Sequence, residues 1–249
     1  MKGYAPVNGL QMYYEIHGEG SPLVLIHGGG STIETSFSNL LPDLSRSFKV
    51  IAMDLQAHGR TNDRNAPETF QQDADDVAAL LQYLGIPKAD FLGFSNGGST
   101  TMQVAIRHRQ LVDKIVVISG VYRREGLIPG FFDGLAGATL KDMPAFLREA
   151  YLKVAPDEAG LQVMFEKDRD RMLHFEDWPV EQLRSIDVPA LIMASDLDVI
   201  TREHTVDIAR QIPGARLAIL PGTHGVLIGE GEGRRDAGIA IAIIKDFLK

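Results

Sequence analysis

The feature that most constrains the fold of this chain is a succession of short, continuous apolar runs separated by segments of helical periodicity. Residues 23–26, for example, form one such run, which stops at His27. Runs of this kind are typical of parallel strands that are covered on both faces. Strands that alternate with helices predict an α/β fold, with a mostly parallel central sheet flanked by helices. We predict strands at residues 11–16, 23–26, 50–53, 89–94, 114–118, 190–194 and 217–220, and helices at 69–84, 97–108 and about 236–248.

The stretch 121–183 departs from this succession because it contains no clear β run. It mixes aromatic and methionine side chains with charged ones, and we interpret it as a small inserted helical cap on an α/β core formed by residues 1–120 and 184–249. Binding pockets are lined mainly by apolar side chains. The candidates for substrate binding are therefore Phe131, Phe132, Met164 and Trp178, although packing of the cap on itself is the simpler interpretation of any single one of them.

Composition excludes several functional classes. The 249 residues carry a formal net charge of −8, which provides no electrostatic footprint for nucleic acid. The absence of cysteine excludes disulfides, a thiolate nucleophile and thiolate metal ligands. The apolar stretches are too short to span a bilayer, and no secretory signal is visible. We therefore expect a cytoplasmic protein without a membrane or nucleic-acid partner, whose oligomeric state the sequence leaves open.

A serine at the end of a predicted strand is the first candidate for chemistry. The residues Gly93-Phe94-Ser95-Asn96-Gly97 fit the pattern G-x-S-x-G, between a predicted strand and a predicted helix. Glycines on both sides allow a sharp turn that exposes the serine hydroxyl. The serine then lies at the amino end of a helix, which favours negative charge. This context predicts Ser95 as a nucleophile.

A serine hydroxyl needs a base, and the base needs a group that orients it. Of the seven histidines, His224 is the best placed, because it follows the last predicted strand in a glycine-flanked loop. The preceding strand ends in a segment with two carboxylates, Asp196 and Asp198. The chain order serine, aspartate, histidine is the order expected of the nucleophile-elbow fold.

At this point the sequence resembles the α/β-hydrolase superfamily over nearly its whole length. Further matching segments are residues 27–30, His-Gly-Gly-Gly, and residues 54–61, which resemble a loop of small esterases, lactonases and cofactor-free haloperoxidases. Relatives commonly read G-x-x-D where this chain has Ser195 to Asp198, so the resemblance implies Asp198 as the acid and Asp196 as a turn former. It also implies that backbone N–H groups of Gly29 and Asn96 form the oxyanion hole. Asn96 replaces a larger apolar residue, so its side chain could contact substrate.

The resemblance implies a serine hydrolase that cleaves a small or medium carboxylic ester through an acyl-enzyme. A lactonase, a C–C hydrolase or a perhydrolase would use the same triad, and a ligand-binding receptor with little turnover would also keep it. Haloalkane dehalogenases and epoxide hydrolases are disfavoured, because those relatives carry Asp in place of Ser95. We expect no cofactor and no metal, since His58 has no partner at ligand spacing and is interpreted, like His27, as structural.

Overall fold

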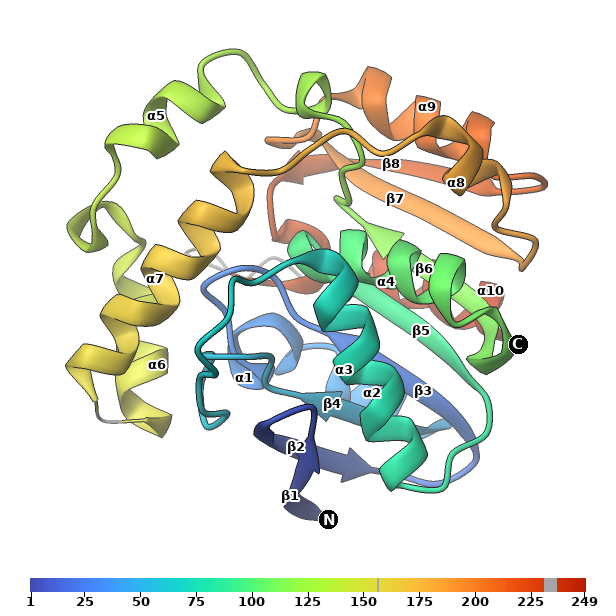
Figure 1. The fold of residues 1–249 in the computed structure, drawn as a ribbon. Helices are drawn as coiled ribbons and strands as arrows, with labels where there is room; N and C mark the ends of the chain where they lie inside the picture. The colour runs from blue at the N-terminus through green and yellow to red at the C-terminus, as the bar shows by residue number, and fades with distance from the viewer. Residues whose placement is uncertain (156, 231–236) are drawn as a thin grey trace.

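The computed structural model describes residues 1–155, 157–230 and 237–249, and a twisted sheet runs through it (Figure 1). The eight strands have the order β1-β2-β4-β3-β5-β6-β7-β8, and all neighbours from β4 onward are parallel. This arrangement confirms the predicted mostly parallel α/β sheet. The strands are β1 (Lys2–Val7), β2 (Leu10–His17), β3 (Ser21–Ile26), β4 (Phe48–Met53), β5 (Ala89–Phe94), β6 (Val112–Ile118), β7 (Ala190–Leu197) and β8 (Arg216–Thr223).

The sequence-based prediction did not include the first strand. β1 pairs antiparallel with β2 through a tight turn at Asn8 and Gly9. Both turn residues have positive φ, +46° and +85°, which is the backbone of a type I′ hairpin turn, and Asn-Gly is the favoured sequence for it. β2 then pairs antiparallel with β4, so the hairpin forms one edge of the sheet.

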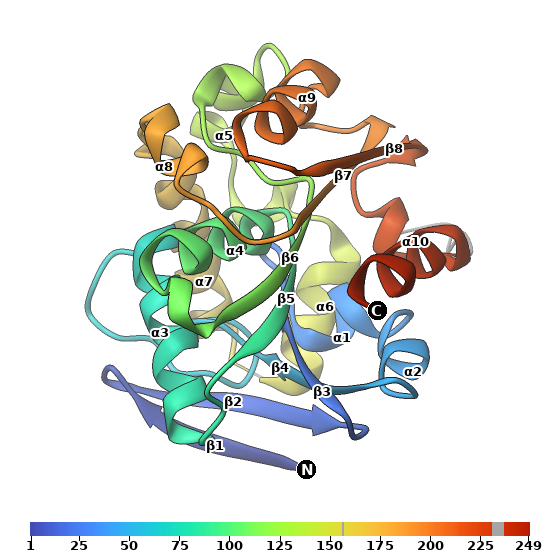
Figure 2. The same ribbon diagram turned by 90° about the vertical axis from the view of Figure 1, so that its right-hand side faces the viewer.

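Helices cover both faces of the sheet (Figures 1 and 2). Strand side chains alternate between the faces, so that Val24 and Ile26 pack in one apolar core and Leu23 and Leu25 pack in another. The first core receives α3 (Phe70–Tyr83), α4 (Asn96–Arg107), α8 (Val180–Arg184) and α9 (Arg202–Gln211), whereas the second receives α1 (Ile33–Phe37), α2 (Leu41–Leu44) and α10 (Gly238–Leu248). Within the described ranges, no helix is long and apolar enough to cross a membrane.

Helix ends follow local chemistry. α3 begins after Thr69, whose hydroxyl accepts the N–H of Gln72 at 3.0 Å, so one of the unpaired donors of the first turn is satisfied. The last helix begins at Gly238, whereas the predicted start near Asp236 lies outside the described residues. Short 3₁₀ turns lie at Arg109–Leu111, Arg124–Gly126, Leu140–Asp142 and Val226–Ile228.

Three helices between β6 and β7 form a separate layer, which we call the cap (Figure 1). They are α5 (Phe131–Gly137), α6 (Ala145–Val154) and α7 (Glu158–Leu173). Side chains of α6 and α7 share a small apolar cluster with Ala57 of the core. α8 belongs to the predicted cap range, but its Leu183 packs in the core beside α4 and α9.

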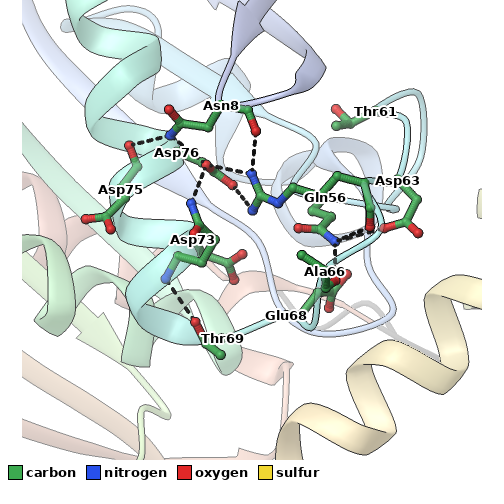
Figure 3. A network of polar contacts seen from close by, with 12 residues as sticks. Asn8, Gln56, Thr61, Asp63, Ala66, Glu68, Thr69, Asp73, Asp75 and Asp76 are labelled. Carbon is green, nitrogen blue, oxygen red and sulfur yellow. Dashed lines mark hydrogen bonds and ion pairs between the residues drawn. The ribbon is translucent and has the colours of Figure 1, made fainter.

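The loop between β4 and α3 is held by polar contacts on several sides (Figure 3). Arg64 donates to the Asp76 carboxylate of α3 and to the carbonyl of Asn8 in the hairpin turn. From the cap, Lys167 of α7 donates to Asp63 at 2.7 Å and to the carbonyls of Arg64 and Ala66. The loop therefore connects the hairpin, α3 and the cap.

Candidate active site

Ser95 lies in a strained turn between β5 and α4. Its φ and ψ are +55° and −120°, a conformation that is costly for a residue with a side chain. The flanking glycines make the turn possible: a Cβ on Gly93 would lie 2.0 Å from the carbonyl oxygen of Gly97, and one on Gly97 would lie 2.0 Å from that of Ile26. No larger residue fits at either position, and the serine side chain is left facing a cavity.

A chain of hydrogen bonds links three residues from three separate loops. His224 Nε2 lies 3.1 Å from Ser95 Oγ, and His224 Nδ1 lies 2.7 Å from Asp198 Oδ1. If Nδ1–H donates to the carboxylate, Nε2 is free to accept the serine proton. Because Ser95 follows β5, Asp198 follows β7 and His224 follows β8, the carboxyl ends of parallel strands bring the three side chains together.

The two aspartates at the carboxyl end of β7 have different partners. Asp198 accepts from His224, from the Ser119 hydroxyl at 2.6 Å and from the Ile200 N–H at 3.1 Å. Burial alone would raise the pKa of Asp198, but the contacts with His224, the Ser119 hydroxyl and the Ile200 N–H together outweigh burial and lower it, so the carboxylate stays charged. Asp196 instead accepts the N–H of Gly222 at 2.8 Å and thereby holds the segment that leads to His224. Ser119, which the sequence-based prediction missed, carries no motif and lies at the end of β6.

The residues proposed for an oxyanion hole lie on both sides of Ser95. Neither the N–H of Gly29 nor that of Asn96 donates a hydrogen bond within the described part of the chain. Asn96 opens α4, so its N–H also lies at the positive end of a helix dipole. His27 is fully buried and holds the neighbouring backbone, since its Nε2 accepts the Leu55 N–H at 2.9 Å and its Nδ1 lies 2.7 Å from the Gly28 carbonyl oxygen.

A cavity of about 360 Å³ lies between the cap on one side and Ser95 and His224 on the other. Of the predicted substrate-binding residues, Phe131 and Met164 line it. Phe132 is not among its lining residues: its ring packs under the Arg124 guanidinium, 3.6 Å from the ring centroid. Trp178 lies elsewhere as well, in an aromatic cluster with Phe70 and Phe175. The apolar lining comprises Val121, Leu127, Phe131, Leu135, Ala138, Met143, Pro144, Leu147, Met164, Phe165, Met172, Val199 and Ile200.

Next to this cavity lies a buried cluster of charged groups that the sequence-based prediction missed. Asp168 of α7 accepts a hydrogen bond from His58 Nε2 at 2.9 Å, and Arg171 contacts Glu68 and Asp73. Burial alone would lower the pKa of His58, but the Asp168 carboxylate outweighs burial and raises it to about 9. His58 is therefore a charged partner of Asp168. The two residues are 110 positions apart in the sequence, so no local pattern could have revealed the pair.

The described residues contain no group of three or more His, Asp or Glu side chains arranged to hold a metal ion. The arrangement around Ser95 thus brings together a hydroxyl, an imidazole, a carboxylate and two N–H donors without partners among the described residues, beside an apolar cavity. Those are the parts that acyl transfer to serine requires.

Several known proteins resemble this chain in sequence. The human serine hydrolase BPHL is 28% identical over 246 residues, which cover 88% of this chain and 79% of that protein. A dihydrolipoyllysine-residue acetyltransferase component of an acetoin cleaving system from Cupriavidus necator is 33% identical over 136 residues, 54% of this chain. The chain spans only 36% to 41% of the length of that protein and of another relative that it matches.

Solved structures extend the likeness to the whole fold. The enol-lactonase from Burkholderia xenovorans superposes with a TM-score of 0.77 and 24% identity, over 98% of this chain and 99% of that one. The model of the family described as alpha/beta hydrolase fold matches residues 21–179. This chain therefore belongs to the α/β-hydrolase family.

Proposed function

We propose that the protein is a serine hydrolase that cleaves small or medium carboxylic esters with an apolar acyl or alcohol group. The observation that carries this proposal is the hydrogen-bonded series Asp198, His224, Ser95 at the floor of an apolar cavity. The name of the human relative, a serine hydrolase, supports the same class.

Each residue has a separate role in the proposed reaction. His224 takes the proton of Ser95 as its oxygen attacks the ester carbonyl, and Asp198 stabilises the imidazolium that forms. The N–H groups of Gly29 and Asn96 donate to the oxyanion of the tetrahedral intermediate. His224 then protonates the leaving alcohol. In the second half, His224 activates a water that attacks the acyl-enzyme and releases the acid.

The cavity supports the proposed substrate class. Its volume of about 360 Å³ lies near the lower end of the range for small-molecule pockets, roughly 300 to 1,000 Å³. Its lining is mainly apolar. The charged residues that line it are Asp142, Asp168 and Arg169, and each already has a polar partner within the protein. A charged substrate group would therefore lose its hydration without gaining a free partner.

Esterase profiling tests the proposal. Among p-nitrophenyl esters of increasing acyl length, we expect turnover of short and medium chains, with a higher kcat/KM for the butyrate than for the charged hemisuccinate. Ser95→Ala should abolish both turnover and labelling by a fluorophosphonate, whereas Ser185→Ala, at an exposed serine that does not line the cavity, should retain both. Undiminished labelling of Ser95→Ala would remove Ser95 from its role, and a preference for the hemisuccinate would contradict the substrate class.

A further inference from the structure

Both sides of the proposed oxyanion hole are linked to one carboxylate that comes from the cap. We propose that Asp168 of α7 is a positioning residue that holds Gly29 and Asn96 in place for catalysis. This inference rests on the proposed function, because it assigns Asp168 a part in the same reaction. Its consequence is that the oxyanion hole is complete only when the cap helix is docked on the core.

The contacts of Asp168 reach both halves of the hole. Oδ2 accepts a short hydrogen bond from the N–H of Gly30, directly after Gly29. Oδ1 accepts from the side-chain amide of Asn96 at 3.2 Å. The carboxylate also packs on Gly29 itself, since a Cβ added there would lie 3.1 Å from Oδ2. Asp168 thus touches both residues but leaves their own N–H groups unpaired.

The restraint by Asp168 matters because the segment that it contacts consists of glycines. Residues 28–30 are all glycine, so their peptide groups can rotate more freely than those of other residues. The hydrogen bond to Gly30 fixes the peptide on the far side of Gly29 and so limits rotation about Gly29. Oxyanion donors act only when they are aimed at the developing charge, and small displacements are costly.

A carboxylate beside an oxyanion would by itself oppose catalysis, because both are negative. Here the charge of Asp168 is balanced by His58, whose Nε2 lies 2.9 Å from the carboxylate. His58 also donates through Nδ1 to the Gln56 carbonyl at 2.7 Å, so both of its ring nitrogens are occupied and the ring cannot turn away. Asp168 can therefore restrain the hole without adding net negative charge to it.

Helix α7 is held at this position by residues on either side of Asp168. Lys167 donates to the loop between β4 and α3, and Arg171 pairs with Glu68 and Asp73. Asp168 lies between these two anchors. Movement of α7 away from the core would remove the carboxylate from Gly30 and Asn96 together.

The test measures kcat and KM separately for Asp168→Asn and Asp168→Ala, with Asp170→Asn as the control. Asp170 is the neighbouring acid on α7, half-exposed and paired only with Arg169 among the described residues. We expect kcat of the Asp168 variants to fall about 10- to 100-fold while KM changes less than about threefold, because positioning acts in the transition state. Asp170→Asn should match the wild type.

A double-mutant cycle with Asn96→Ala separates positioning from a merely structural role. Asn96→Ala keeps the backbone N–H but removes the amide that contacts Asp168, so kcat should fall by several-fold in a protein with unchanged melting temperature. Added to Asp168→Ala, it should cost little more, because both changes break the same contact. If Asp168→Ala does not fold, Asn96→Ala and Asp168→Asn still carry the test.

Several results would overturn the inference. They are a folded Asp168 variant with kcat within about twofold of the wild type, a loss confined to KM, or additive effects in the cycle. Ser95→Ala distinguishes failure of the proposed function from failure of the role assigned to Asp168. If Ser95→Ala stays active, the proposed function fails, whereas if it is inactive and the Asp168 variants are unimpaired, only this inference fails.

Discussion

At the level of single residues, the two aspartates that end β7 show how position rather than residue type assigns a role. Asp198 is buried and bonds to His224 Nδ1, whereas Asp196 bonds to the backbone of Gly222. Both are carboxylates, two positions apart, and both support His224. Only Asp198 can stabilise the charge that His224 gains during the proposed reaction.

Replacement of each aspartate by asparagine should therefore have very different effects. Asp198→Asn removes the charge that orients His224 and stabilises its protonated form, and in a chymotrypsin-type triad the corresponding change lowers kcat by about 10⁴-fold. Asp196→Asn keeps an oxygen that can accept the Gly222 N–H, so we expect less than about a tenfold loss. Ester hydrolysis by the two purified variants measures the difference. The reverse ranking would mean that the acid has been assigned to the wrong residue.

At the level of elements, helix α7 is unusual in the charges that it buries. Within five residues it directs Lys167, Asp168 and Arg171 toward the core, and Asp168 and Arg171 find their partners below the surface. The pairing has a consequence for stability, because His58 holds its proton more tightly in the folded protein than an unfolded chain would.

The dependence of stability on pH should reveal this pair. The pKa of His58 is raised to about 9 in the folded protein and is about 6.5 in an unfolded chain. The resulting stabilisation is complete below about pH 6.5 and is lost as the pH rises through about 9, a difference on the order of 3 kcal/mol. Asp168→Asn should lose this part of the pH dependence. Urea unfolding at intervals from pH 6 to 10 measures the free energy of unfolding of the wild type and of Asp168→Asn. If this free energy depends on pH in the same way in both proteins, His58 is not the charged partner of Asp168.

Features with a local sequence signal could be predicted, whereas features that depend on the packing of the cap on the core could not. Apolar runs such as residues 23–26 and the glycines around Ser95 are local signals, so the parallel strands and the sharp turn at Ser95 could be predicted. β1 was missed because only alternate residues of it are buried and Pro6 interrupts it. Which of Phe131 and Phe132 faces the cavity depends on the phase of α5, and the pair of His58 with Asp168 exists only once the cap has folded onto the core.

At the level of the whole molecule, the cap and the core are joined by buried charges as well as by apolar contacts. Arg171 of α7 is almost fully buried and contacts Glu68 and, at 3.1 Å, Asp73 of α3. Its guanidinium also lies 5.4 Å from the centre of the Phe70 ring. Burial and the neighbouring carboxylates raise the pKa of Glu68 to about 7, although the positive charge of Arg171 acts in the opposite direction. The charged forms of Glu68 and Asp73 therefore depend on Arg171 for their stabilisation.

Loss of Arg171 should consequently destabilise the protein far more than loss of a neighbouring surface arginine. Arg171→Met keeps the apolar stem but leaves Glu68 and Asp73 buried without their cation, which costs about 3 to 5 kcal/mol in comparable buried pairs. Arg169→Met removes a more exposed pair with Asp170 and should cost at most about 1 kcal/mol. Urea unfolding followed by the fluorescence of Trp178, the single tryptophan, reports on both variants, since its ring packs against Phe70 beside Arg171. Equal losses of unfolding free energy in the two variants would contradict the special role of Arg171. If the loss in Arg171→Met becomes smaller at low pH, where Glu68 and Asp73 are neutral, the unpaired charge of these two acids is its cause.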